Sequence, residues 1–93
     1  MTVEQRGPLP PSNFAQGRAG RAIDKIVLHT MVAWIGSADR HFHNPAAQVS
    51  AHFGVRIDGT LWQWVDLADT AYHSGDLEVN QSSIGIEHED AGD

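Results

Sequence analysis

The sequence predicts one α/β or α+β domain built on a β-sheet of at least four strands. The 93 residues fit a single small domain. Three features carry the strand pattern: an apolar run over Ile23–His29, two strand-like runs flanking Asp58-Gly59, and an alternating run over Ser83–Glu89. Such a sheet needs a covering helical layer, and no long amphipathic helix is visible. We therefore expect the covering helices to come from sequence outside this chain or from a partner.

The composition narrows the class of function. The formal net charge of -6, without clustered Lys or Arg, argues against nucleic acid as a partner. No cysteine is present, which excludes disulfides and thiolate metal sites within the chain. No apolar run approaches the roughly 20 residues of a membrane-spanning helix, and Met1 to Pro11 lacks the apolar centre of a secretory signal. Six histidines are more than solubility requires, and histidine is the commonest metal ligand.

The first third of the chain contains one predicted strand. Residues 1–22 are expected to form an extended lead-in, because Gly7-Pro8 and Pro10-Pro11 interrupt regular structure. Residues 23–93 are expected to form the domain itself. Its first strand, Ile23–His29, is apolar at almost every position, which is typical of a strand covered on both faces.

The connections show little periodicity. We expect Met31–Asn44 to be a loop with room for a short helical turn near Trp34. Pro45–Val49 could form one helical turn, with the proline at its first position. Further on, Asp66–Gly75 is predicted to be a loop and Asp76–Gln81 a polar connection.

The dipeptide Asp58-Gly59 predicts a β-hairpin with a tight two-residue turn. Pairing outward from that turn sets Ile57 against Thr60, Val55 against Trp62, and Phe53 against Trp64. This register would gather the two tryptophans, the phenylalanine and the valine into one apolar layer.

The last strand places acidic side chains inside an apolar run. Alternation puts Ile84, Ile86 and His88 on one side and Gly85, Glu87 and Glu89 on the other. A carboxylate that faces protein costs several kcal/mol unless something pairs with it. Glu87 is therefore either a strand-edge carboxylate in water or a general base beside a metal-bound water.

Several histidines are open to two interpretations. His29 ends a buried strand, where α/β proteins place their sites, but it could equally be a core histidine bonded to backbone. A zinc ion needs three or four ligands, so His29 cannot hold one alone. His41 and His43 form a His-x-His pair that could bind metal or simply be solvated. His52 is either a site residue or a strand partner, and Tyr72-His73 either a substrate rim or a packed turn.

Taken in order, five motifs resemble those of the zinc-dependent N-acetylmuramoyl-L-alanine amidases. That superfamily includes phage endolysins, cell-wall recycling amidases and peptidoglycan recognition proteins. The match runs from about Ile23 to Glu89. The motifs are Ile26-Val27-Leu28-His29, Val49-Ser50-Ala51-His52-Phe53, Arg56-Ile57-Asp58-Gly59-Thr60, Ala71-Tyr72-His73-Ser74-Gly75 and Ser83-Ile84-Gly85-Ile86-Glu87.

The resemblance implies an α/β fold, a mixed central sheet with flanking helices, and one Zn²⁺ in a groove that binds peptidoglycan or muropeptides. His29 matches the family's first zinc ligand, and Glu87 matches the carboxylate with which recycling-type members activate water. Endolysin-type members instead carry a tyrosine where this chain has Ala51, which favours Glu87 as the catalytic residue. The positions expected to form or line the substrate groove are Thr30, Gln48, His52, Tyr72 and His88.

The chain departs from the family pattern at its end. The family's second zinc histidine and its third ligand lie downstream of the last strand, as do its C-terminal helices, and this chain contains none of them. We interpret it as the N-terminal part of an amidase catalytic domain. The implied reaction cleaves the amide between N-acetylmuramic acid and L-alanine of the stem peptide, and the missing leader fits a phage endolysin or a cytoplasmic enzyme.

Two alternatives to that hydrolase remain open. One is a non-catalytic peptidoglycan-binding module. The other is an incomplete domain that associates with itself or with a partner chain through its uncovered sheet.

Overall fold

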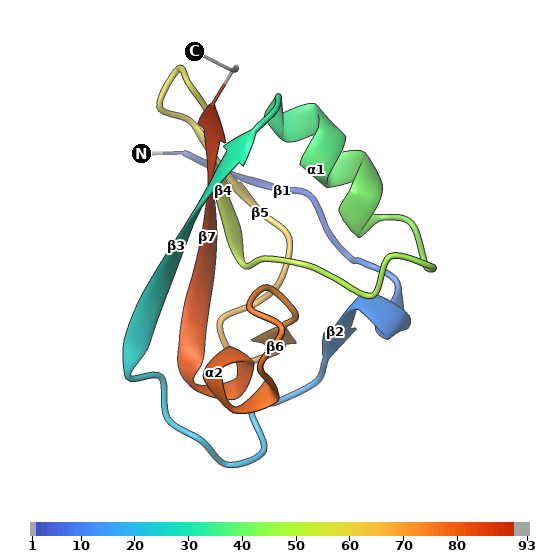
Figure 1. The fold of residues 1–93 in the computed structure, drawn as a ribbon, viewed down its shortest axis with the longest axis vertical. Coiled ribbons are helices and arrows are strands. Elements are labelled where there is room, and N and C mark those ends of the chain that lie inside the picture. The colour runs from blue at the N-terminus through green and yellow to red at the C-terminus, as the bar shows by residue number, and fades with distance from the viewer. Residues whose placement is uncertain (1, 91–93) are drawn as a thin grey trace.

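The computed structural model describes residues 2–90, apart from the side chains of residues 31 and 32. Its centre is a mixed five-stranded sheet in the order β1-β5-β4-β7-β3 (Figure 1). Those strands are β1 (Val3–Gln5), β3 (Lys25–Val32), β4 (Phe53–Val55), β5 (Leu61–Gln63) and β7 (Ser83–Asp90). A smaller sheet pairs β2 (Phe14–Ala15) with β6 (Thr70–Ala71), and the helices are η1 (Pro11–Asn13, a 3-10 turn), α1 (Ile35–Phe42) and α2 (Leu77–Ser82).

The predicted fold class, a mixed sheet with flanking helices, is confirmed by this arrangement. None of the helices in residues 2–90 is both long and apolar enough to cross a membrane.

Strand β7 holds the sheet together. It pairs in parallel with β3 on one side and with β4 on the other, and the long β3–β7 pair dominates the ribbon (Figure 1). The predicted last strand is confirmed and runs one residue further, to Asp90. Its alternation separates two faces, which we call the covered face, carrying Glu87 and Trp62, and the open face, carrying Ile86 and Leu28.

The prediction for the first strand, Ile23–His29 covered on both faces, is wrong in its bounds and in its surroundings, and His29 lies inside the strand, not at its end. β3 begins at Lys25, ends at Val32 and lies at the edge of the sheet, not between two covered faces. Ile26 and Leu28 are 61% and 65% exposed. Their apolar run indicates a covered strand, but nothing in residues 2–90 packs over this part of the open face.

The predicted hairpin is present, but its register is wrong by one residue. Val55 pairs with Leu61, and Gly54 pairs with Trp62. The connection is a three-residue loop between Arg56 and Thr60. The Arg56 N–H donates a hydrogen bond to the Thr60 carbonyl at 2.9 Å. Gly59 takes a left-handed φ of 89° there, as in hairpins that combine a turn with a bulge. The Asp-Gly signal predicts the turn correctly but does not fix the loop length.

The shift in register changes the composition of the apolar layer. Trp62 stands opposite Gly54, and a Cβ on that glycine would lie 2.6 Å from the rings of Trp64 and from Ile35. The two tryptophans therefore share the covered face with α1. Phe53 pairs with Gln63 and faces the open side, not the tryptophan layer.

α1 lies where the sequence predicted a loop with room for a short helical turn near Trp34, and it is longer than one turn. α2 lies where the sequence predicted a polar connection. In α1, Ile35, Ala38 and Phe42 are buried at helical spacing, and the Phe42 ring meets Trp64 edge-on at 4.9 Å between centroids. α2 begins after Asp76, whose carboxylate accepts a hydrogen bond from the Val79 N–H. Short length and weak helix formers hide both elements in the sequence.

The segment Pro45–Val49 is not helical, contrary to the prediction. The Ala47 N–H closes a turn on the Asn44 carbonyl, and Gln48 adopts a left-handed φ of 56°. The buried Asn13 explains this conformation, because its side-chain oxygen accepts the Gln48 N–H at 3.0 Å.

The lead-in is extended but packs against the rest of the domain. It contributes β1 to the sheet, and Leu9, Asn13 and Arg18 are buried. The Arg18 guanidinium donates to the backbone carbonyls of Leu67 and Ser83 at 2.7 and 2.9 Å, which fastens the lead-in to the start of β7. The domain boundary at residue 22 stays a prediction.

Candidate active site

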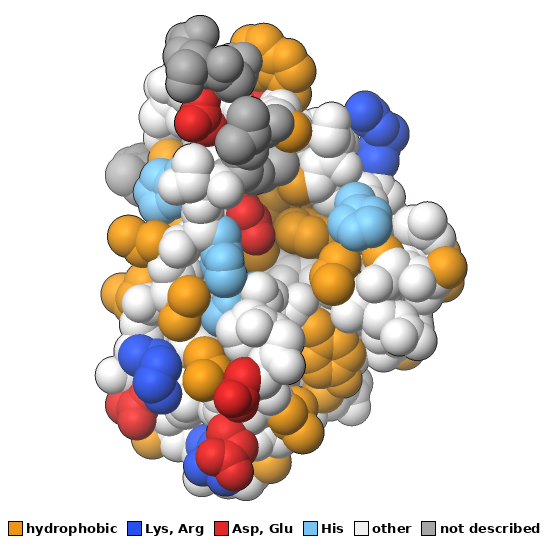
Figure 2. Space-filling view, in the orientation of Figure 1, with side chains coloured by type: hydrophobic (Ala, Val, Ile, Leu, Met, Phe, Trp, Pro, Cys, Tyr) orange, Lys and Arg blue, Asp and Glu red, His pale blue; other side chains and the backbone are white. Residues whose placement is uncertain are grey.

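His29 and Glu87 are brought together by the pairing of β3 with β7. They are direct partners in this parallel register, so their side chains leave the same, covered face from strands about 4.8 Å apart. Figure 2 shows histidine and acidic side chains gathered in the middle of the molecule, over the β3–β7 pair. An imidazole and a carboxyl group from separate strands therefore lie side by side on one face of the sheet.

Glu87 is half-buried, with β4 on its other side. Its partner there is Gly54, and the space above that glycine is filled by Ile35 and Trp64. Burial raises the pKa of Glu87 above its ordinary value, and the charges of His29 and His88 oppose that shift. A carboxylate in this setting gains affinity for a proton.

The neighbouring acid on the same face has a different environment. Glu89 accepts hydrogen bonds from the backbone N–H groups of Ile35, at the start of α1, and of Ile57 in the hairpin loop. Among the residues that the structure describes, Glu87 has no hydrogen-bond partner. Glu89 thus supports the fold, while Glu87 is free to exchange a proton.

The sequence indicates His73 only as part of a substrate rim or a packed turn with Tyr72, and it does not predict the contact with His29. The Nδ1 of His73 lies 2.9 Å from Nε2 of His29, and its Nε2 lies 2.9 Å from the Ser83 hydroxyl. Burial, followed by the charges of His29, His52 and Arg18, lowers the pKa of His73 to about 4. The ring is therefore neutral near pH 7. No local pattern marks it, since the contact joins residues far apart in the sequence.

His52 lies in the core and not in a groove. It has no exposed surface; its Nδ1 accepts the Gly85 N–H at 3.1 Å, and its Nε2 lies 2.9 Å from the Asp69 carbonyl. These two bonds place the ring proton on Nε2. Burial lowers the pKa of His52, and the positive charge of Arg18 adds to the shift. The interpretation of His52 as a strand partner fits this position, and direct substrate contact does not.

The other predicted groove residues are divided between the two faces. Thr30 and His88 pair with each other on the open face, away from His29 and Glu87. Tyr72 is half-buried next to His73, and its backbone bonds to both the N–H and the hydroxyl of Ser50. Gln48 is exposed, two residues before Ser50.

His41 and His43 lie at the end of α1. His43 Nε2 contacts the Arg6 carbonyl at 2.8 Å, and neither residue contacts His29. The His-x-His pair is therefore separate from the candidate site.

The residues present do not complete a metal site. Within the described part of the chain, no three His, Cys, Asp or Glu side chains are grouped so that they could hold a metal ion. Zinc needs three or four such ligands, and His29 with Glu87 falls short of that number. The role of His29 as a zinc ligand stays a prediction.

A cleft of about 430 Å³ lies at the other end of the long strands. It is lined by charged residues that pair with one another, such as Lys25 with Asp24 and Arg21 with Glu78. Ligands of α/β sheets bind beyond the carboxyl ends of strands, whereas this cleft lies at the amino ends of β3 and β7. We therefore place the candidate site at His29 and Glu87.

Comparisons with known proteins point to one family. A family model described as N-acetylmuramoyl-L-alanine amidase matches residues 19–93. The curated N-acetylmuramoyl-L-alanine amidase A of Achromobacter lyticus is 35% identical over 81 residues, which cover 86% of this chain and 45% of that protein.

Solved structures agree with this match. The catalytic domain of XlyA superposes with a TM-score of 0.76 at 27% identity, covering 100% of this chain and 65% of that one. A mutant endolysin from Bacillus subtilis gives 0.76 at 26% identity, covering 96% and 61%. A Se-Met derivative of AmpD, at 24% identity and a TM-score of 0.69, supports the fold alone. The chain thus spans less than two thirds of the length of each of these proteins.

Proposed function

The chain belongs to the N-acetylmuramoyl-L-alanine amidase family, and from this membership we propose that the whole protein is a peptidoglycan hydrolase. The reaction would cleave the amide between N-acetylmuramic acid and the L-alanine of the stem peptide. The observation that carries the proposal is the placement of His29 and Glu87 as register partners on one face of the sheet.

Glu87 would act as the general base. Its half-buried carboxylate, without a hydrogen-bond partner in residues 2–90, can take a proton from an attacking water and return it to the leaving amine. Burial raises the pKa of Glu87, which brings its proton affinity closer to the working pH than that of an exposed glutamate.

We further propose that the whole protein depends on zinc. His29 would supply one ligand, and the remaining ligands would come from residues outside those described here. A bound zinc ion polarises a carbonyl and lowers the pKa of a coordinated water.

Tyr72 and Gln48 are the groove contacts that we retain. Tyr72 comes directly before His73, which contacts His29, and its backbone bonds to Ser50. Gln48 lies two residues before Ser50, so a stem peptide beside His29 would pass close to both. Thr30 and His88 are left out because they lie on the open face, and His52 because it is buried.

Glu87→Gln tests the proposal in the protein that carries the complete amidase domain. Loss of the general base should lower turnover of purified peptidoglycan by about 100-fold or more, measured as newly released amino groups of L-alanine. Glu78→Gln is the matched control, since it makes the same change on an exposed side chain of α2 and should leave turnover unaltered. Turnover at the parent rate in Glu87→Gln would remove Glu87 from the mechanism.

A further inference from the structure

The two ring nitrogens of His29 have different surroundings. Nε2 lies 2.9 Å from Nδ1 of His73, and the two rings meet edge-to-face with centroids 5.1 Å apart. Nδ1 of His29 has no hydrogen-bond partner among the residues that the structure describes. One nitrogen is thus held and the other is free.

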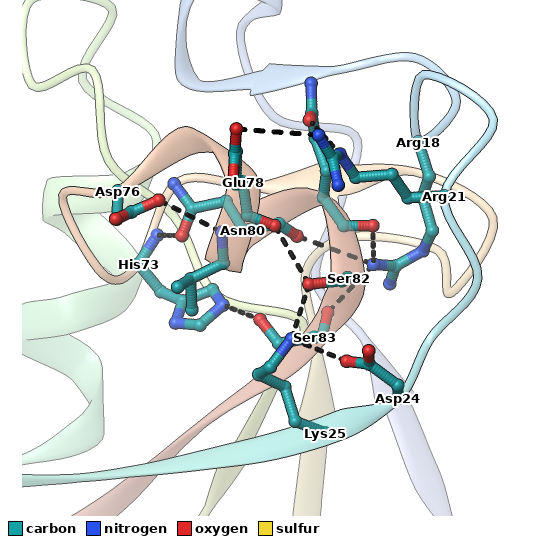
Figure 3. Close-up of polar contacts among 12 residues, drawn as sticks. Arg18, Arg21, Asp24, Lys25, His73, Asp76, Glu78, Asn80, Ser82 and Ser83 are labelled. Carbon is teal, nitrogen blue, oxygen red and sulfur yellow. Dashed lines mark hydrogen bonds and ion pairs between the residues drawn. The ribbon is translucent and has the colours of Figure 1, made fainter.

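His73 is itself held from several sides. Its Nε2 contacts the Ser83 hydroxyl at 2.9 Å, and its backbone N–H is directed at the Asn80 side chain (Figure 3). The ring rests on the backbone of Gly85, where an added Cβ would fall 2.4 Å from the His73 ring. Any larger residue at position 85 would displace the imidazole. These contacts fix the position of His73 independently of His29.

We propose that His73 is a positioning residue for His29, which fixes the orientation of that ring and reserves its Nδ1 for a divalent cation. The inference rests on the proposed function for the cation, but the ring contact itself does not. Histidines that bind metal commonly use their second nitrogen for a hydrogen bond that orients the ring, and here the partner is another imidazole.

The contact restricts how protons are distributed over the two rings. Only one proton can lie between Nε2 of His29 and Nδ1 of His73, because a hydrogen bond needs one donor and one acceptor. Each neutral ring carries a single N–H, so the nitrogen that accepts leaves the proton of its ring on the other nitrogen. Either both rings are protonated at Nε2, and the Ser83 hydroxyl accepts, or both are protonated at Nδ1, and the hydroxyl donates. The two histidines must therefore share the same tautomer. A cation on Nδ1 of His29 selects the arrangement with both protons on Nε2.

Long-range ¹H–¹⁵N correlation spectra of the ¹⁵N-labelled 93-residue chain near neutral pH test this pairing. We expect His29 and His73 each to populate one tautomer, and the same one. The exposed His41 serves as an internal reference for a ring without such a constraint. Opposite tautomers in the two rings, or His29 averaging between tautomers as His41 does, would overturn the proposal.

Two variants separate the contact from general loosening of the core. His73→Phe keeps a ring above Gly85 but removes both nitrogens, so His29 should lose its single tautomer and populate both. Gly54→Ala is the matched control, because a Cβ there also meets close neighbours on the covered face but contacts Ile35 and Trp64 instead of His73. Loss of the paired tautomers in Gly54→Ala as well would assign the effect to packing and contradict the positioning role of His73.

Titration with Zn²⁺ alone tests the reserved nitrogen. The ¹⁵N signal of His29 Nδ1 should shift in the parent chain, with both rings protonated at Nε2. In His73→Phe either nitrogen of His29 should respond. A shift at Nε2 of His29 in the parent chain would overturn the proposal. Paired tautomers without any response of His29 to Zn²⁺ would instead remove His29 from the zinc ligands of the proposed function, and the ring contact would stand.

Discussion

The two faces of the sheet come from the same strands but have very different surroundings. On the covered face, α1 packs on Trp62 and Trp64, and the space above Gly54 is completely filled. On the open face, Ile26 and Leu28 are mostly exposed. His29 and Glu87 also lie on the covered face, on the neighbouring strands β3 and β7, and both are half-buried. The covered face thus holds both the buried core and the candidate site, while the open face leaves apolar side chains exposed.

The largest change in the free energy of unfolding is expected from removing a tryptophan from the covered face. Trp64 is almost fully buried, its ring meets Phe42, and its indole N–H donates to Asp39 at 2.9 Å. Trp64→Ala should lower the free energy of unfolding by about 3–5 kcal/mol, since it leaves a large cavity and removes the indole hydrogen bond to Asp39, whose carboxylate keeps its contacts with Arg6. Urea unfolding followed by circular dichroism measures the loss. A cost below about 1 kcal/mol would mean that the covered face is not the main source of stability.

A smaller effect is expected from acid, which acts on the buried histidines of the covered face. Burial lowers the pKa of His52 below its ordinary value near 6.5, so the unfolded chain binds more protons than the folded one as the pH falls below that value. Stability is therefore complete above about pH 7 and decreases as the pH falls through 6.5 towards the lowered pKa.

Unfolding free energies measured between about pH 7 and pH 5 test this sign. His52→Gln should flatten the decrease without abolishing it, because the lowered pKa of His73 contributes with the same sign. The variant should also be less stable at neutral pH, since a glutamine cannot reproduce both bonds of the imidazole, to Asp69 and Gly85. A steeper dependence on pH in His52→Gln would contradict the assignment.

The smallest effect is expected on the open face. Leu28 is 65% exposed, so its side chain makes few packing contacts that a serine would lose. Leu28→Ser should therefore change the free energy of unfolding of the 93-residue chain by less than about 0.5 kcal/mol. The same pair of proteins tests the predicted self-association through the open face, because light scattering should report smaller particles for the serine variant. A destabilisation close to that of Trp64→Ala would show that Leu28 is buried in solution.

The amino-acid sequence by itself predicts which side chains of the last strand lie on the same face of the sheet. The alternation over Ser83–Glu89 assigns Glu87 and Ile86 to opposite faces, whereas the pairing of Glu87 with His29 came from the register of β3 with β7. The alternation is local, since the side-chain period of a strand follows from its backbone geometry. The order of the motifs also predicted the family.

Only the tertiary structure decided the rest. The hairpin register depended on one extra loop residue, which a dipeptide signal does not specify, and that residue moved Phe53 away from the tryptophans. The contact of His73 with His29 required β3, β7 and the loop before α2 to meet over Gly85. Such a contact has no sequence period, because it depends on how distant segments pack and not on the conformation of either one.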